Sequence, residues 1–336
     1  MLRSLRTTKP STAFRCLYST APEKPSIKLV AELRKRTEVS IVKAREALSA
    51  SGNDVDAALE WLQKDLIASG AKKAEKVGGR ATNEGLVSVS VLSDYTASGL
   101  QRGLRAAMIE LNCETDFVGR NELFGQLAAD IAHTAAIISE PSGASPLLTI
   151  QPEYLAEAPL ISQSNPTAPP AGTVASAIRD TIAKVGENIT LRRALAVAAQ
   201  PPTGPSQALR LANYVHGTIH RPTEGRIGTL ALLGLRHPSP EGFSSEFIAK
   251  IEALERALGR QIVGFDTKAI ESASLEDQTA LYNQPFITIA GELNGQSVKD
   301  VLNQWSVQEG LVSTAEEQGA VKVLNFAKWA VGEPLS

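Results

Sequence analysis

One order of patterns occurs twice along this chain, and it limits the folds that the chain can adopt. Each occurrence has two short, apolar-rich segments of strand character, followed by a segment with apolar residues three or four positions apart; in residues 85–92 apolar and polar side chains alternate. These patterns cover residues 85–92, 106–111 and 124–135 in the first occurrence, and 208–215, 228–233 and 247–258 in the second. Alternation is typical of a half-buried strand and the wider spacing of an amphipathic helix. The sequence therefore predicts an α+β protein with two β-hairpin-plus-helix units.

A separate helical module is predicted before the first hairpin, over residues 26–68. Three short segments there carry apolar residues at helical spacing. Ser40 stands where the second helix needs a cap, Gly52 can end that helix, and Asn53 or Asp54 can begin the third. Charged residues followed by a glycine pair then predict a linker over residues 69–80.

Proline separates the two hairpin units. Seven of the chain's 18 prolines fall between residues 141 and 170. Because proline at this density disfavours helices and central strands, we expect a linker or surface insertion over residues 141–172. The hairpin units then occupy residues 81–140 and 173–336.

The amino-terminal segment differs from the rest in charge. Residues 1–20 carry Arg3, Arg6, Lys9 and Arg15 without an acidic residue. With its many serines and threonines, this composition predicts a mitochondrial transit peptide and tail over residues 1–25 and a matrix location; the alternative is a disordered basic tail. Without the four positive charges of this segment the formal charge changes from −2 to −6. This balance argues against nucleic-acid binding and favours a protein partner.

The sequence lacks the usual marks of an enzyme, a cofactor site or a membrane span. It contains no GxxxxGK[ST], GxGxxG, HExxH or GxSxG pattern, and no apolar run near the length of about 18–20 residues that a span needs. His216 and His220 have a metal-like spacing, but Gly217 and Pro222 favour a hairpin loop over a zinc site. Cys113 precedes Glu114 and should have a raised pKa, which favours a structural thiol over a thiol enzyme.

Residues 109–121, at the end of a predicted strand, are the most informative segment. Read as local structure, Thr115 or Asp116 caps the next turn and Phe117 anchors in the core. The residues Asn-Cys-Glu-Thr-Asp-Phe-Val at 112–118 also closely resemble the signature of the elongation factor Ts family, which exchanges nucleotide on elongation factor Tu.

Other segments resemble the same family in the same order. They are residues 33–37 with 43–48, 52–57, 186–193, 214–217, 225–228 and 284–286. The resemblance covers most of residues 27–332 and implies a ubiquitin-associated-like helical module followed by two duplicated subdomains, the first a dimerisation-type α+β repeat. Together with the amino-terminal segment, it points to the mitochondrial members.

The resemblance implies a function without catalysis. The chain would promote GDP release from mitochondrial elongation factor Tu, with no cofactor, metal, nucleic acid or membrane involved. Phe117 would be a wedge between helices of the partner, with Asp116 near the partner's magnesium site, and Thr115 and Val118 completing the contact. His216 would provide a second contact, and Ile41 and Val42 would dock the helical module.

Two departures from the family pattern accompany the resemblance. Ile41 and Val42 are shorter than the bulky pair, often methionines, that family members carry. The interval 264–283 leaves no room for the long helical hairpin of bacterial members.

The alternative function is a ubiquitin-associated-like adaptor that binds nascent chains or another protein and has no exchange activity.

Overall fold

The computed structural model describes residues 24–37, 39–92, 104–141, 146–200, 202, 207–218, 220–236, 243–314, 317 and 319–335. Residues 1–23 of the predicted transit peptide and tail lie outside these residues. The chain divides into two units, Met1–Ala68 and Ser69–Ser336, and mixes helices with antiparallel sheets, as expected for an α+β protein.

The first unit contains the three helices that the sequence predicts. They are α1 (Ile27–Thr37), α2 (Ile41–Ala50) and the beginning of α3 (Val55–Val77). Leu33, Ala44 and Leu48 are fully buried in its small core. The Ser40 hydroxyl accepts a hydrogen bond from the Lys43 amide and caps α2.

The predicted linker is helical over most of its length, because α3 continues to Val77 in the second unit. Its alanine, lysine and glutamate residues have high helix propensity, which outweighs the connector character of the segment. Within the second unit, Val77 is buried in the core and the Lys73 ammonium donates to the Ala183 carbonyl at 2.8 Å. A linker beginning at residue 69 was therefore the wrong description of this segment up to Val77.

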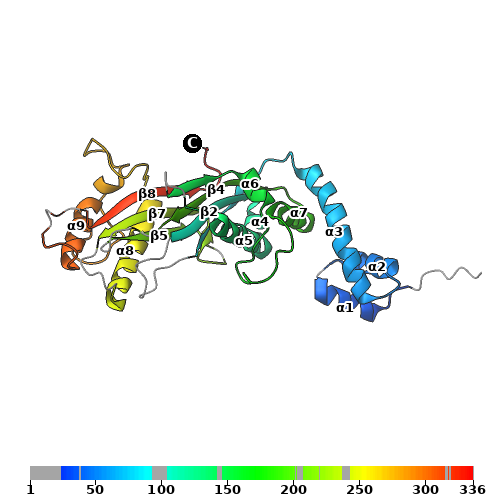
Figure 1. Ribbon diagram of the computed structural model, residues 1–336. Helices are drawn as coiled ribbons and strands as arrows, with labels where there is room; N and C mark the ends of the chain where they lie inside the picture. Colours follow the sequence, from blue (N-terminus) through cyan, green and yellow to red (C-terminus); the bar gives the residue numbers. More distant parts are fainter. Residues whose placement is uncertain are drawn as a thin grey trace, which may run out of the picture. The chain divides into compact units, whose positions relative to one another are not determined.

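Two antiparallel sheets form the second unit (Figure 1). The five-stranded sheet has the order β3-β4-β2-β1-β6, and the three-stranded sheet has the order β5-β7-β8. The strands are β1 (Glu84–Val91), β2 (Leu104–Cys113), β3 (Leu147–Ile150), β4 (Ile189–Ala199), β5 (Gln207–His216), β6 (Glu224–Gly225), β7 (Ile227–Arg236) and β8 (Val321–Ala330).

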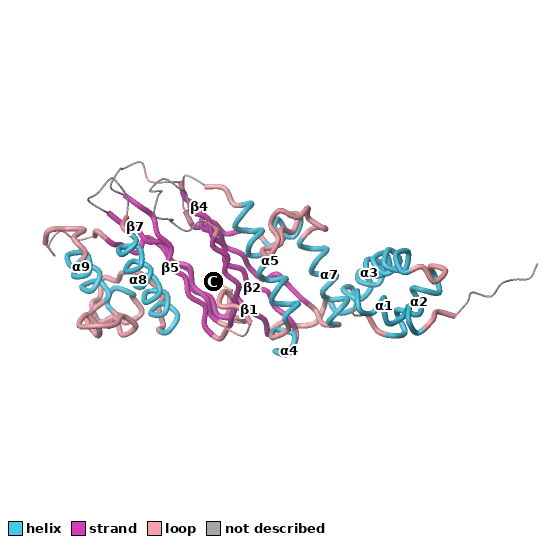
Figure 2. Tube along the Cα trace, turned by 90° about the horizontal axis from the view of Figure 1, so that it is seen from below, coloured by secondary structure: helices cyan, strands magenta, loops and turns pink. Residues whose placement is uncertain are grey.

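Helices cover the outer face of each sheet, and the inner faces pack together (Figure 2). The helices beside the larger sheet are α4 (Asp116–Gly119), α5 (Glu122–Ile138), α6 (Pro152–Glu157) and α7 (Val174–Val185); beside the smaller sheet are α8 (Ser245–Gly264), η1 (Leu281–Asn283) and α9 (Val298–Gln308). Val87, Met108 and Leu230 are buried between the sheets. A Cβ on Gly228 would lie 2.7 Å from Val87 Cγ1, so this glycine permits the close approach of the sheets.

Both expected strand–strand–helix successions are present, as β1–β2–α5 and β5–β7–α8. The boundary between them differs from the prediction, because β4 pairs with β2 and so places residues 189–199 in the first sheet. The smaller sheet instead gains β8, which pairs with β7. Local periodicity cannot reveal either pairing, because which strands pair depends on how the faces of the whole unit pack together.

The proline-rich insertion also contains regular structure, which corrects its description as a linker. β3 is an edge strand, and α6 begins with Pro152 at its first position. Pro146 lies just before the edge strand and Pro152 in the first turn of the helix, and both places tolerate proline because neither needs the missing N–H group. Residues 265–280 hold no helical hairpin, as the sequence predicts.

Buried charge ties the end of the chain to the larger sheet. Glu110 is fully buried and accepts from Arg192 at 2.9 Å and from Arg193 at 2.6 Å. Its carboxylate also accepts from the Gly332 amide at 2.9 Å, just beyond β8. These bonds satisfy the buried carboxylate and hold the two sheets together.

Candidate functional site

The residues after β2 form a tight turn that carries the predicted wedge. Thr115 caps α4 and accepts a hydrogen bond from the Val118 amide at 3.4 Å. Asn121 then caps α5 by accepting from the Leu123 amide at 2.8 Å. Two caps in succession allow the chain to leave the strand and begin a long helix within eight residues, 114–121.

Phe117 projects from this turn with 82% of its surface exposed. The adjacent Val118 is instead buried in the core beneath the turn. The local interpretation with Phe117 as the core anchor is therefore wrong, because Val118 occupies that place. Val118 is also wrongly placed among the surface contacts, since its side chain supports the turn from inside.

Asp116 shares the exposed side of the turn. Its carboxylate forms an ion pair with Arg120, one helical turn later, at 3.5 Å. Both side chains are about half exposed or more, at 49% for Asp116 and 66% for Arg120. Because exposed pairs of this kind contribute little to stability, the carboxylate can exchange Arg120 for another positive group.

Residues of the 186–193 segment hold the turn from behind. Glu187 accepts from the Thr115 amide at 3.0 Å and from the Thr115 hydroxyl at 2.7 Å. In return, the Asn188 amide donates to the Glu114 carboxylate at 2.7 Å. Reasoning from the residues did not identify Glu187, although a carboxylate directly after the glycine that ends a helix was a usable signal.

The loop between β5 and β7 lies at the same end of the unit as the turn. His216 is exposed at the end of β5, and its carbonyl accepts from the Arg226 amide at 2.8 Å. Further along this loop, the His220 ring donates from Nε2 to the Arg120 carbonyl at 2.8 Å. The structure thus brings the His216 loop to the α4 turn, and His220 is a contact that sequence reasoning did not assign.

A partly buried polar network fixes the base of this loop to α5. Arg221 donates to Gln126 at 2.7 Å and pairs with Glu224 at 3.2 Å. Burial raises the pKa of Glu224, although Arg221 opposes this shift. Gly125 leaves the space for this carboxylate, since a Cβ there would lie 2.7 Å from Glu224 Oε2.

The predicted surface of the helical module consists of Ile41 and Val42 in the first turn of α2. Ile41 is 47% exposed and Val42 is 76% exposed. Behind them, Ala44, Ala47 and Leu48 fill the module's core. The pair is therefore free to contact another molecule without disturbing the packing of the module.

Cys113 lies directly below the turn as a buried free thiol. Burial, followed by the carboxylates of Glu187 and Glu84, raises its pKa to about 12. The expectation of an unreactive thiol agrees with this pKa, but the responsible carboxylates differ from the sequence neighbour Glu114. A thiol of this kind stays protonated at neutral pH and is a poor nucleophile.

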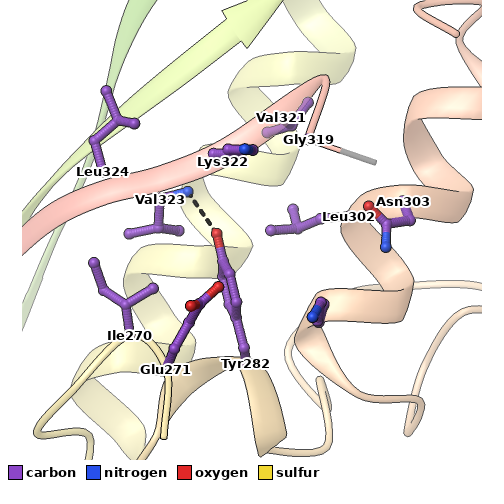
Figure 3. A pocket seen from close by; sticks show the side chains of 11 residues that line it. Ile270, Glu271, Tyr282, Leu302, Asn303, Gly319, Val321, Lys322, Val323 and Leu324 are labelled. Carbon is purple, nitrogen blue, oxygen red and sulfur yellow. Dashed lines mark hydrogen bonds between the residues drawn. The ribbon is translucent and has the colours of Figure 1, made fainter. Parts of the chain in front are cut away.

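The structure offers no second centre with obvious chemistry among its described residues. A cavity of about 410 Å³ lies between α9, β8 and the residues before η1 (Figure 3). In it, the Tyr282 hydroxyl accepts from the Val323 amide at 2.9 Å and so satisfies an edge-strand N–H group. Within the described ranges, no three His, Cys, Asp or Glu side chains gather as a metal site, and no helix is long and apolar enough to cross a membrane.

Comparison with known proteins identifies the family of the chain. The family model for elongation factor Ts matches residues 114–280, beginning at the turn. The chain is 70% identical over 336 residues to the mitochondrial elongation factor Ts of Coprinopsis cinerea, covering 100% of this chain and 99% of the relative. It is 61% identical over 322 residues to that of Laccaria bicolor, covering 94% of each chain. The chain therefore belongs to the elongation factor Ts family, the nucleotide exchange factors of elongation factor Tu, and to its mitochondrial members.

Proposed function

We propose that the Asp116–Phe117 turn promotes GDP release from mitochondrial elongation factor Tu by inserting the Phe117 ring into the partner's nucleotide domain. Such a step needs no acid, base or nucleophile, because the factor only has to bind the nucleotide-free partner more tightly than the GDP-bound partner. By thermodynamic reciprocity, the nucleotide weakens the factor's binding to the same degree that the factor weakens nucleotide binding.

The exposure of Phe117 carries this proposal. An aromatic residue with 82% of its surface in water gains little stability from the fold of its own chain. The turn behind it is nevertheless held by packing and hydrogen bonds, with Val118 in the core and the Thr115 amide bound to Glu187. A rigid support with an unpacked apolar ring suits a group that is buried only in the complex.

The proposal includes two further contacts with the partner, one through His216 and one through Ile41 and Val42. His216, on the loop that touches Arg120, forms a second contact from the β5–β7 hairpin. Ile41 and Val42 dock the ubiquitin-associated-like module on the same partner and contribute affinity. The two hairpin-plus-helix subdomains thus present one exchange surface, and no observation favours an adaptor without exchange activity.

Replacing Phe117 tests the proposal. In a stopped-flow assay with fluorescent GDP on mitochondrial elongation factor Tu, Phe117→Ala should slow release by about ten- to a hundredfold, because each lost 1.4 kcal/mol costs about tenfold in rate. Its melting temperature should stay within about 2 °C of wild type, since an exposed side chain makes few contacts.

Leu275→Ala is the matched control, because Leu275 is 84% exposed in the same unit. It should exchange at the wild-type rate. Normal exchange by Phe117→Ala, or strong destabilisation with normal exchange per folded molecule, would contradict the proposal.

A further inference from the structure

We infer that Glu187 is a positioning residue for nucleotide exchange, which it serves by fixing the direction in which the Asp116–Phe117 turn projects. The inference rests on the proposed function of Phe117. Glu187 itself is half-buried behind the turn and touches neither Asp116 nor Phe117 through a hydrogen bond to their side chains.

The contact between Glu187 and Thr115 is made at two points. One carboxylate oxygen accepts from the Thr115 amide at 3.0 Å, and the other accepts from the Thr115 hydroxyl at 2.7 Å. The same hydroxyl accepts from the Val118 amide at 3.4 Å. Glu187 therefore fixes the residue before Asp116 and, through it, the first turn of α4.

The support is reciprocal, so it resists rotation as well as translation. While Glu187 binds the Thr115 amide, Glu114 binds the Asn188 amide at 2.7 Å. Asn188 also donates its side-chain amide to the Arg80 carbonyl at 2.8 Å. Two neighbouring segments thus each give a carboxylate to the other's backbone, and charge-assisted bonds of this kind are the strong ones.

The chain before Glu187 gives the carboxylate a fixed base. Gly186 ends α7 in the left-handed conformation, with φ of 80°, and its amide donates to the Ile182 carbonyl at 2.8 Å. Ile182 is buried in the core under the larger sheet. Glu187 is therefore held by a packed helix as well as by its bonds to the turn.

Direction matters because Phe117 has no packing of its own to orient it. If the turn can swing, the ring reaches the partner in many orientations, and few of them are productive. Docking through the helical module is unaffected, since Ile41 and Val42 belong to the other unit. Loss of Glu187 should therefore reduce the maximal rate of release more than the apparent affinity.

A double-mutant cycle on the full-length mature chain tests this role. Glu187→Ala should lower the maximal GDP release rate by about five- to twentyfold, with a half-saturating factor concentration within about twofold of wild type. Glu187→Gln keeps the side-chain shape and one acceptor, so its maximal release rate should lie between those of wild type and Glu187→Ala. In the Phe117→Ala background, Glu187→Ala should have almost no further effect, because the group that it positions is absent.

Asp180→Ala on α7 is the matched control and should exchange normally. An additive slowdown in the double mutant would overturn the inference, since Glu187 would then act without Phe117. A normal rate for Glu187→Ala or Glu187→Gln with a slow Phe117→Ala would also overturn it and leave the proposed function standing. If Phe117→Ala exchanges normally, the proposed function fails instead. Should Glu187→Ala not fold, as judged by circular dichroism, the cycle is completed with Glu187→Gln.

Discussion

Two surfaces of this chain present exposed apolar side chains on different kinds of support. Phe117 is 82% exposed and Val42 is 76% exposed. The Phe117 turn is held by hydrogen bonds to Glu187 and Asn188, distant in sequence. The Ile41–Val42 surface depends on neighbours in the chain, namely the Ser40 cap and the small helical core behind α2.

The difference matches what each surface is proposed to do. A docking surface needs area and shape, and a short helix with a local cap provides both. A wedge must keep its direction while it displaces part of the partner, so it needs support from elements that do not move with it. The long-range bonds around Thr115 provide that support.

After Phe117→Ala, the largest effect on exchange should come from disrupting the Ile41–Val42 surface. This change should weaken the affinity for elongation factor Tu and leave the maximal release rate nearly unchanged. We expect Ile41→Asp with Val42→Asp to raise the half-saturating factor concentration in the exchange assay by about tenfold or more, because charges in an apolar contact are costly. The maximal release rate should stay near wild type. Ile27→Asp, in the same module and 82% exposed, is the control. A lower maximal rate with unchanged affinity would remove the distinction between the two surfaces.

Asp116→Ala should slow GDP release by a smaller factor, about three- to tenfold, because it removes a single exposed charge beside the wedge. The Arg120 pair is exposed, so the melting temperature should hardly change. The difference from wild type should shrink as salt is added, since salt screens exposed charges. A loss as large as that of Phe117→Ala, or independent of salt, would show that Asp116 does more than provide charge.

The smallest expected effect is on the pH dependence of folding stability, which should differ between the two units. Burial lowers the pKa of His133 in α5, against the opposing effect of Asp130. Below about pH 6.5 the unfolded chain therefore takes up a proton that the folded chain resists, and stability falls as pH falls through this range. The sequence has no histidine among residues 26–68, so this effect should be confined to the second unit.

Thermal unfolding of wild type and His133→Gln from about pH 7 to 5 measures the effect. The variant should lose less stability on acidification, by a few degrees in melting temperature. Exposed His216→Gln should behave like wild type. An equal loss in His133→Gln would show that other groups cause the acid sensitivity.

The sequence by itself determined the local features of this protein. The three amino-terminal helices, the Ser40 and Thr115 caps and both strand–strand–helix successions follow from periodicity and capping, which act over a few residues. The resemblance of residues 112–118 was enough to indicate the family. The assignment of Phe117 was different, because the residues alone allowed a core anchor and the resemblance implied a wedge.

Only the tertiary structure decided features that depend on distant parts of the chain. It placed β4 beside β2, extended α3 to Val77 and buried Val118 in place of its neighbour Phe117. It also brought Glu187 to Thr115 across a separation of 72 residues. Such contacts depend on the packing of whole sheets and helices, so the residues near the turn cannot predict which distant residues support it.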